Sequence, residues 1–197
     1  MEIQKWIGII AAIVSTAAYF PYAKAILTSK GQVHPNQASW IVWAVVDWSV
    51  FFSSIAAGVY QTAWVFLAFA VGSTFIAILS LRYGDSYWSK LDVFCLITSA
   101  VAFVMWKTTN TPETAIFLNI FVAIVGSIPT FTKSWSEPES EDKLTWAIFL
   151  VGGVLNVMAI KTFDWKDAAP PIAVALVQMA IVVLVSVRPR WNRAVGW

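Results

Sequence analysis

The sequence is poor in the residue types that most enzymes use for metal binding and nucleophilic catalysis. It contains one cysteine, Cys95, and one histidine, His34, in 197 residues. A single cysteine excludes an intrachain disulfide, and the two residues together supply too few ligands for a metal cluster. We therefore expect no metal and no cofactor. A membrane enzyme would need several His, Cys or carboxylate groups at one depth, and because the sequence offers no such cluster we do not expect an enzyme.

Charge is also scarce. Charged residues make up 12% of the chain, about half of what a soluble domain carries. The net charge of +2 is too small to indicate a nucleic-acid partner. By contrast, 59% of the residues are hydrophobic and the mean hydropathy is +0.71. These proportions predict a chain that lies mostly in lipid.

The apolar residues gather into seven runs. A helix needs roughly 20 apolar residues to cross the hydrocarbon core of a bilayer, and the Lys, Arg, Asp and Glu residues lie almost wholly between the runs. The predicted spans are Trp6–Leu27, Ser39–Gly58, Ala63–Leu81, Leu91–Trp106, Thr114–Phe131, Leu144–Ile160 and Pro171–Val187. None alternates polar and apolar residues as a barrel strand does. We therefore predict an all-α, polytopic membrane protein with no separate soluble domain, whose first span is not a cleaved signal peptide.

The basic residues are distributed unevenly over the two sides of the predicted membrane. Four lie on the side of the N-terminus: Lys5, Lys107, Lys161 and Lys166. The other nine lie on the opposite side: Lys24, Lys30, Arg82, Lys90, Lys133, Lys143, Arg188, Arg190 and Arg193. Because cytoplasmic loops carry the excess of Lys and Arg, we expect a multi-pass protein of the cell membrane with its N-terminus outside and its C-terminus in the cytoplasm.

Tryptophan is abundant, and most of its positions flank the predicted spans. The flanking tryptophans are Trp6, Trp40, Trp64, Trp88, Trp106, Trp146 and Trp165. Such positions are typical of the aromatic belt at a membrane–water interface, and we interpret these residues in that way. Trp43 and Trp48 lie inside the second span and are not explained by a belt.

The two halves of the chain repeat one pattern. Pro21 and Pro129 each lie near the end of an apolar run, and a polar loop and a Ser-Trp or Thr-Trp pair follow each proline. We therefore predict two three-helix units, residues 1–84 and 111–197, joined by a linker helix in residues 85–110. Two parallel units of this kind are a known plan for carriers. Each proline removes a backbone hydrogen bond, so it is either a hinge for a gate or a static kink.

This layout resembles the superfamily of PQ-loop proteins, SWEET carriers and KDEL receptors. The likeness lies in the three-plus-one-plus-three arrangement and in the prolines near the cytoplasmic ends of the first and fifth helices. The Pro-Gln pair of the PQ-loop group is replaced here by Pro21-Tyr22 and Pro129-Thr130. The stretches "HPNQASWIVW" and "KSWSEPESEDKLTW" look most similar to bacterial PQ-loop-like membrane proteins without an assigned function. The resemblance implies a carrier that rocks between two open states around a site between its units.

Asp47 is the strongest candidate for a functional residue. An aspartate near the bilayer centre costs at least ~2.5 kcal/mol on insertion scales, so it must face a cavity or a partner. We expect it to contact solute and to serve in proton coupling. Other polar or aromatic residues at similar depth complete the predicted substrate site: Trp43, Ser73, Thr74, Asn156 and Gln178. The alternative is a network of hydrogen bonds that only holds the helices together.

The expected function is the transport of a small polar solute, as a uniporter or with coupled protons. The partners are this solute (a sugar, nucleoside, amino acid or vitamin), the membrane lipids and, as an option that the sequence leaves open, a second copy of the chain. The alternative is a receptor or accessory subunit with the same fold that does not transport. A retinal protein is set aside, because Gln178 occupies the depth at which such a protein carries its lysine.

Overall fold

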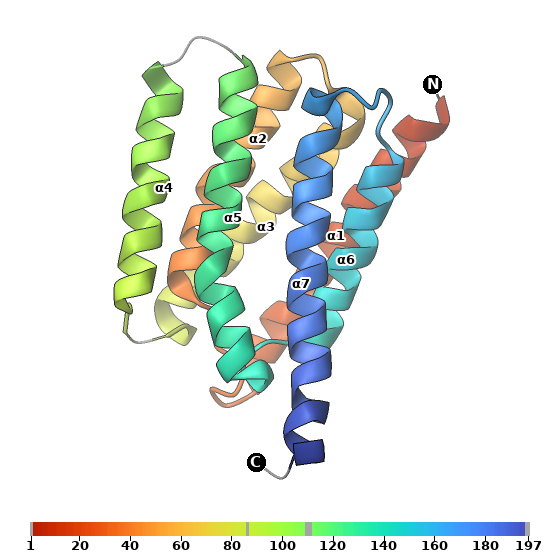
Figure 1. The fold of residues 1–197 in the computed structure, drawn as a ribbon. Coiled ribbons are helices and arrows are strands. Elements are labelled where there is room, and N and C mark those ends of the chain that lie inside the picture. The colour runs from red at the N-terminus through yellow and green to blue at the C-terminus, as the bar shows by residue number, and fades with distance from the viewer. Residues whose placement is uncertain (1, 86, 109–111, 196–197) are drawn as a thin grey trace.

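The computed structural model describes residues 2–85, 87–108 and 112–195, and the regular elements of this part of the chain are all helices (Figure 1). Its elements in chain order are α1 (Glu2–Thr28), α2 (Gln37–Ala56), α3 (Tyr60–Tyr83), α4 (Lys90–Thr108), α5 (Pro112–Ser136), the short 3-10 helix η1 (Pro138–Ser140), α6 (Lys143–Met158) and α7 (Trp165–Val195). The seven α-helices run side by side, and the two chain ends lie at opposite ends of the bundle. We call these ends the N-side and the C-side. The predicted all-α class is confirmed.

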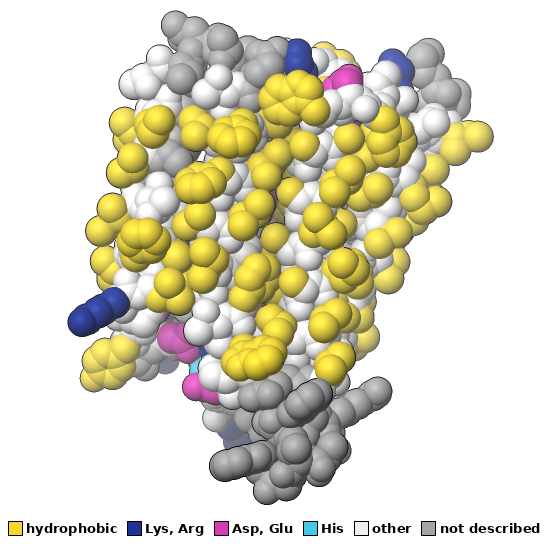
Figure 2. Space-filling model, in the orientation of Figure 1, with side chains coloured by type: hydrophobic (Ala, Val, Ile, Leu, Met, Phe, Trp, Pro, Cys, Tyr) yellow, Lys and Arg dark blue, Asp and Glu magenta, His cyan; other side chains and the backbone are white. Residues whose placement is uncertain are grey.

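Five of the helices are long and apolar enough to cross a membrane. They are α1, α2, α3, α5 and α7, within the stretches Ile3–Thr28, Gln37–Ala56, Tyr60–Tyr83, Ile116–Ser136 and Trp165–Val187. The apolar helix α6 is shorter, with 16 residues. Figure 2 shows hydrophobic side chains covering the middle of the visible face, while charged side chains gather toward the two ends. This banded surface is that of a helical bundle embedded in lipid.

Polar caps fix where two of the central helices begin. The Asn36 side chain accepts a hydrogen bond from the backbone N–H of Ser39 at the start of α2. The Asp142 side chain does the same for Thr145 at the start of α6. Such caps satisfy backbone donors that a helix start leaves free. Each cap stands four residues before a tryptophan, so both tryptophans occupy the first turns of their helices.

Six of the described α-helices form a closed ring, and we call α1, α2 and α3 the first group and α5, α6 and α7 the second, by chain order alone. In the first group α3 packs against both α1 and α2, and in the second α7 packs against both α5 and α6. The groups meet where α1 contacts α6 and where α2 contacts α5. Helix α4 lies against α5 at the outer edge of the bundle (Figure 1). This packing encloses a central region between the two groups.

The tryptophans divide into two sets that the sequence did not separate. Trp6, Trp64, Trp88 and Trp165 are each at least 46% exposed near helix ends, as a belt requires. Trp40 and Trp146, in contrast, are 2% and 3% exposed. Interpreting these two as belt residues is wrong, because their rings point into the bundle and form part of its core. The side chain of Trp106 lies outside the described residues.

Candidate functional site

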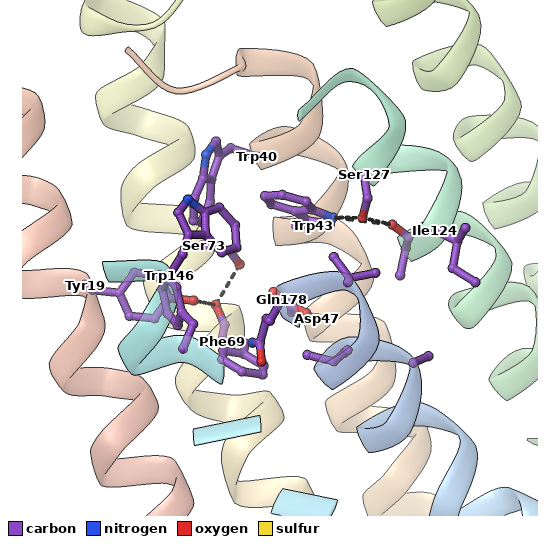
Figure 3. Close-up of a pocket in the computed structure, with 15 residues that line it drawn as sticks. Tyr19, Trp40, Trp43, Asp47, Phe69, Ser73, Ile124, Ser127, Trp146 and Gln178 are labelled. Carbon is purple, nitrogen blue, oxygen red and sulfur yellow. Dashed lines mark hydrogen bonds between the residues drawn. The ribbon is translucent and has the colours of Figure 1, made fainter. Parts of the chain in front are cut away.

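A cavity of about 70 Å³ lies between the two groups of three helices. All helices except α4 contribute to its wall, and Figure 3 shows the side chains that point toward it. The described lining residues are Tyr19, Trp40, Trp43, Asp47, Phe69, Ser73, Ala123, Ile124, Ser127, Trp146, Phe149, Ala173, Val174, Val177 and Gln178. We call this the central cavity.

One face of α2 carries three of the lining side chains. Trp40, Trp43 and Asp47 are spaced three and four residues apart, so they lie on the same side of the helix. Trp40 is buried, whereas Trp43 and Asp47 are only half-buried. The Trp43 indole and the Asp47 carboxylate therefore both line the cavity, one helical turn apart.

Aromatic rings form most of the wall. Trp43 packs edge-on against Trp40 and Trp146, with ring centroids 5.1 and 6.0 Å apart. On the other side Phe149 contacts Tyr19 at 4.8 Å and Phe69 at 6.1 Å. These edge-to-face contacts are the favoured geometry for aromatic pairs, and they hold each ring in place from two directions.

Most hydroxyl groups of the cavity are already engaged by the protein. The Tyr19 hydroxyl donates to the Phe69 carbonyl at 3.3 Å, and the Ser127 hydroxyl donates to the Ala123 carbonyl at 2.7 Å. The Ser73 hydroxyl donates to the Phe69 carbonyl at 2.6 Å and lies within reach of Asp47 as well. Each hydroxyl has one proton to donate, so these three groups have no further proton to donate to a ligand.

Gln178 is a further polar residue of the cavity lining. Its side chain is 5% exposed, and its Oε1 atom has no hydrogen-bond partner among the described residues. A Cβ atom at Gly153 would overlap this oxygen, so the glycine makes room for the amide. A buried amide oxygen without a hydrogen-bond partner is costly in an apolar interior.

The cavity contains no described Lys, Arg or His residue. The Asp47 carboxyl group therefore faces it without a basic partner. Desolvation disfavours the charged form of such a group unless a proton, a cation or hydrogen-bond donors compensate it. Among the described residues, no three His, Cys, Asp or Glu side chains lie close enough together to share a metal ion.

The structure brings four of the predicted substrate residues together and leaves two apart. Trp43, Asp47, Ser73 and Gln178 line the central cavity. Thr74 is turned away; its hydroxyl donates to the Ala70 carbonyl at 2.6 Å and accepts from the Trp48 indole at 3.2 Å.

Asn156 is buried in α6, and it is not among the described residues of the cavity wall. It is 1% exposed, and its Oδ1 atom lacks a partner among the described residues. The two prolines, Pro21 and Pro129, lie inside α1 and α5, toward the C-side, and neither is among the lining residues.

Sequence reasoning missed the aromatic wall. Tyr19, Phe69 and Phe149 lie in apolar runs that give no local sign of a cavity. Trp40 and Trp146 carried a usable signal, because both follow a Ser or Thr at matching positions of the two halves. A belt requires only that a tryptophan lie near a span end, so matched positions were the better guide.

A second cluster of polar residues closes the C-side. Lys133 of α5 contacts the His34 carbonyl and forms an ion pair with Asp85 at 3.0 Å. His34 Nδ1 lies 2.6 Å from the same Asp85 oxygen, and the His34 backbone N–H donates to the Ser140 carbonyl at 3.2 Å. These contacts join the loops after α1 and α3 to α5 and η1. We call this group the C-side latch.

Glu141 adds a buried carboxyl group beside the latch. Its Oε2 atom accepts hydrogen bonds from the Tyr22 hydroxyl at 2.6 Å and from the Trp146 indole at 2.9 Å. Burial raises the pKa of the Glu141 carboxyl group above its ordinary value, although nearby Lys133 and the two donors act in the opposite direction. Glu141 thus ties α1 to the start of α6.

The chain matches no protein-family model, no curated protein and no solved structure. Its class is therefore defined by its own architecture, a helical membrane bundle with an aromatic, carboxylate-containing cavity that six of its described helices line.

Proposed function

We propose that the protein is a small-solute transporter that works by alternating access. The observation that carries this proposal is the central cavity, which lies between two groups of three helices and takes wall residues from both. A site at such an interface can face one side of the membrane or the other when the groups rock against each other. Membrane carriers commonly place their solute sites there.

Matching positions in the two halves support a repeated architecture. Helices α1 and α5 match at a separation of 108 residues, which pairs Pro21 with Pro129 and Tyr19 with Ser127. Helices α2 and α6 match at 106 residues, which pairs Trp40 with Trp146, Trp43 with Phe149 and the cap Asn36 with the cap Asp142. A shift of 105 residues pairs Phe69 with Val174 and Ser73 with Gln178. Except for the prolines and the caps, all these residues line the cavity.

Such pairing favours two three-helix units joined by α4, and with it membership of the PQ-loop, SWEET and KDEL-receptor superfamily. The packing agrees with a two-fold relation, because the α1–α6 contact then corresponds to the α5–α2 contact. Under this proposal α4 is the inversion linker that lets both units insert in the same direction.

The C-side latch would act as one of the two gates. It joins His34 and Asp85 of the first group to Lys133 of the second, so the groups cannot part on this side while its contacts hold. Pro21 and Pro129 lie in the same third of the bundle and supply the points at which α1 and α5 bend. In the proposed orientation this side faces the cytoplasm, because it carries most of the lysine and arginine residues.

A binding screen followed by uptake tests the proposal. The purified protein is screened by thermal unfolding against sugars, nucleosides, amino acids and vitamins, since a ligand that prefers the folded state raises its melting temperature. Each stabilising solute is then offered to proteoliposomes that contain the parent protein or Asp47→Asn. We expect the parent to take up the solute and the variant to lose its driven accumulation. Binding without uptake would instead indicate a receptor.

A further inference from the structure

We propose that the central cavity binds a small organic ammonium cation between the Asp47 carboxylate and the Trp43 ring. This inference deepens the proposed function and rests on it for the claim that the occupant is a transported solute. It is supported by the charge, the hydrogen bonding and the volume of the cavity lining.

The charge of the cavity favours a cation. Asp47 faces it with no described basic residue in the wall. When Asp47 is ionised, a neutral or anionic occupant leaves its charge uncompensated in an apolar environment, whereas a cation supplies the missing charge. A zwitterionic amino acid fits poorly, because its own carboxylate would find no basic partner among the lining residues.

The walls favour an organic cation over a hydrated metal ion. A cation near the face of a tryptophan is attracted by the ring quadrupole, and this attraction is largest where water is excluded. Trp43 lies one helical turn from Asp47 and is only half-buried, so it is the ring available to such a contact. Hard metal ions need several oxygen ligands, and among the described residues no three His, Cys, Asp or Glu side chains lie close enough together to hold one.

The size and hydrogen-bonding capacity of the cavity favour a small occupant over the larger polar solutes. About 70 Å³ holds roughly five water molecules at 10–15 Å³ each, which corresponds to an occupant with about five non-hydrogen atoms. A nucleoside is several times larger. A sugar needs many donors and acceptors, whereas the described lining holds few polar side chains, and the hydroxyls of Tyr19, Ser73 and Ser127 already donate to backbone carbonyls.

Thermal unfolding with a matched pair of probes tests this ligand class. Tetramethylammonium and tert-butanol have nearly the same size and shape, but only the first is charged. We expect tetramethylammonium chloride at millimolar concentrations to raise the melting temperature of the detergent-purified protein. Neither tert-butanol nor sodium chloride at equal ionic strength should do so. If all three additives raise the melting temperature equally, or if none of them raises it, the proposal is overturned.

Variants then locate the binding site. We expect Asp47→Asn to weaken tetramethylammonium binding more than tenfold, and Trp43→Leu to weaken it about tenfold. The controls are Trp48→Leu, on the same helix but outside the described cavity wall, and Asp164→Asn, in an exposed loop on the N-side. Both should bind like the parent. Unchanged binding in Asp47→Asn and Trp43→Leu would place the cation elsewhere and contradict the proposal.

Uptake by proteoliposomes separates this proposal from the proposed function. If tetramethylammonium binds through Asp47 but is not taken up, the ligand class stands and transport is wrong. If the protein takes up a neutral solute and tetramethylammonium does not bind, transport stands and the ligand class is wrong. Asp47-dependent binding together with uptake supports both.

Discussion

At the scale of single residues, Glu141 shows how the fold encloses an ionisable group at the C-side. Both of its hydrogen bonds fall on Oε2, from Tyr22 and Trp146, while Oε1 is buried without a partner among the described residues. Burial raises the pKa of the carboxyl group in the folded protein. The folded state therefore holds the Glu141 proton more tightly than the unfolded state does.

This difference predicts a pH dependence of stability. The contribution of Glu141 is fully present below the ordinary pKa of a glutamate and is lost as the pH rises through the raised value. Glu141→Gln keeps an acceptor oxygen for Tyr22 and Trp146 but cannot ionise. We expect its melting temperature to fall less than that of the parent over this rise in pH. Parallel melting curves for the two proteins would contradict the account.

Gly72 is a residue whose small size positions the cavity wall. A Cβ atom at this position would overlap the Tyr19 ring, which is 8% exposed and packs on Phe149. A ring held on several sides cannot move aside as a flexible side chain can. We expect Gly72→Ala to destabilise the protein by about 1–3 kcal/mol, the usual cost of overpacking, as measured by denaturant unfolding in detergent. Gly153→Ala is the matched comparison, because its neighbour is the end of the Gln178 side chain, and it should cost less.

At the scale of helices, the two prolines distinguish a hinge from a static kink. Pro21 lies inside α1 and Pro129 inside α5, where each removes one backbone hydrogen bond. Replacing both by alanine restores two hydrogen bonds, worth about 0.5–1.5 kcal/mol each. We expect the double variant to melt at a higher temperature and to transport more slowly in proteoliposomes. A normal transport rate would identify the prolines as kinks only.

The C-side latch can be tested against a surface ion pair of the same chain. The Lys133 and Asp85 side chains are only 9% and 21% exposed, so removing the lysine leaves a partly buried charge without its partner. We expect Lys133→Met to destabilise the protein by about 1–3 kcal/mol in denaturant unfolding.

Lys143→Met is the matched control for the latch. Its partner Glu139 lies one turn away at 3.7 Å, and the two side chains are 44% and 69% exposed. Pairs of this kind contribute about 0.3–0.5 kcal/mol, so the control should change stability little. Equal losses from the two lysine substitutions would argue against a special role for the latch.

The sequence predicted the helices better than it predicted their inner faces. Apolar runs and the charges between them indicated all seven described α-helices, five of which have the length and low polarity that crossing lipid requires. Asp47 and Gln178 were found because polar groups are rare at that depth. The aromatic wall was not predicted, since an apolar residue suits lipid and a helix interface equally well, and only packing decides between them. Trp40 and Trp146 illustrate this, and their matching positions were the available clue.

At the scale of the whole molecule, we propose that the two groups of three helices move relative to each other and that the cavity between them holds the transported solute. The C-side is held by the latch, while the cavity presents Asp47 and Trp43 between the groups. Alternating access requires that one cavity residue be reachable from both sides of the membrane at different times. A static bundle with the same cavity would expose that residue to one side only, or to neither.

Thiol labelling measures this property without knowledge of the solute. Cys95 is buried and is the only cysteine of the chain, so it is replaced by serine to give a background without thiols. Single cysteines are then introduced at Ala123 in the cavity wall and, as controls, at Gln32 on the C-side and Phe163 on the N-side. A membrane-impermeant maleimide is applied to right-side-out and to inside-out vesicles. The two exposed controls report the orientation of the protein in the membrane. If the N-terminus is outside, Phe163→Cys should react only from outside, and Gln32→Cys should react only from the cytoplasm.

The reaction of Ala123→Cys tests the central claim most directly. We predict that the impermeant maleimide labels it from both sides of the membrane, while each control cysteine reacts from one side only. Labelling of Ala123→Cys from a single side, or from neither, would contradict alternating access through the central cavity.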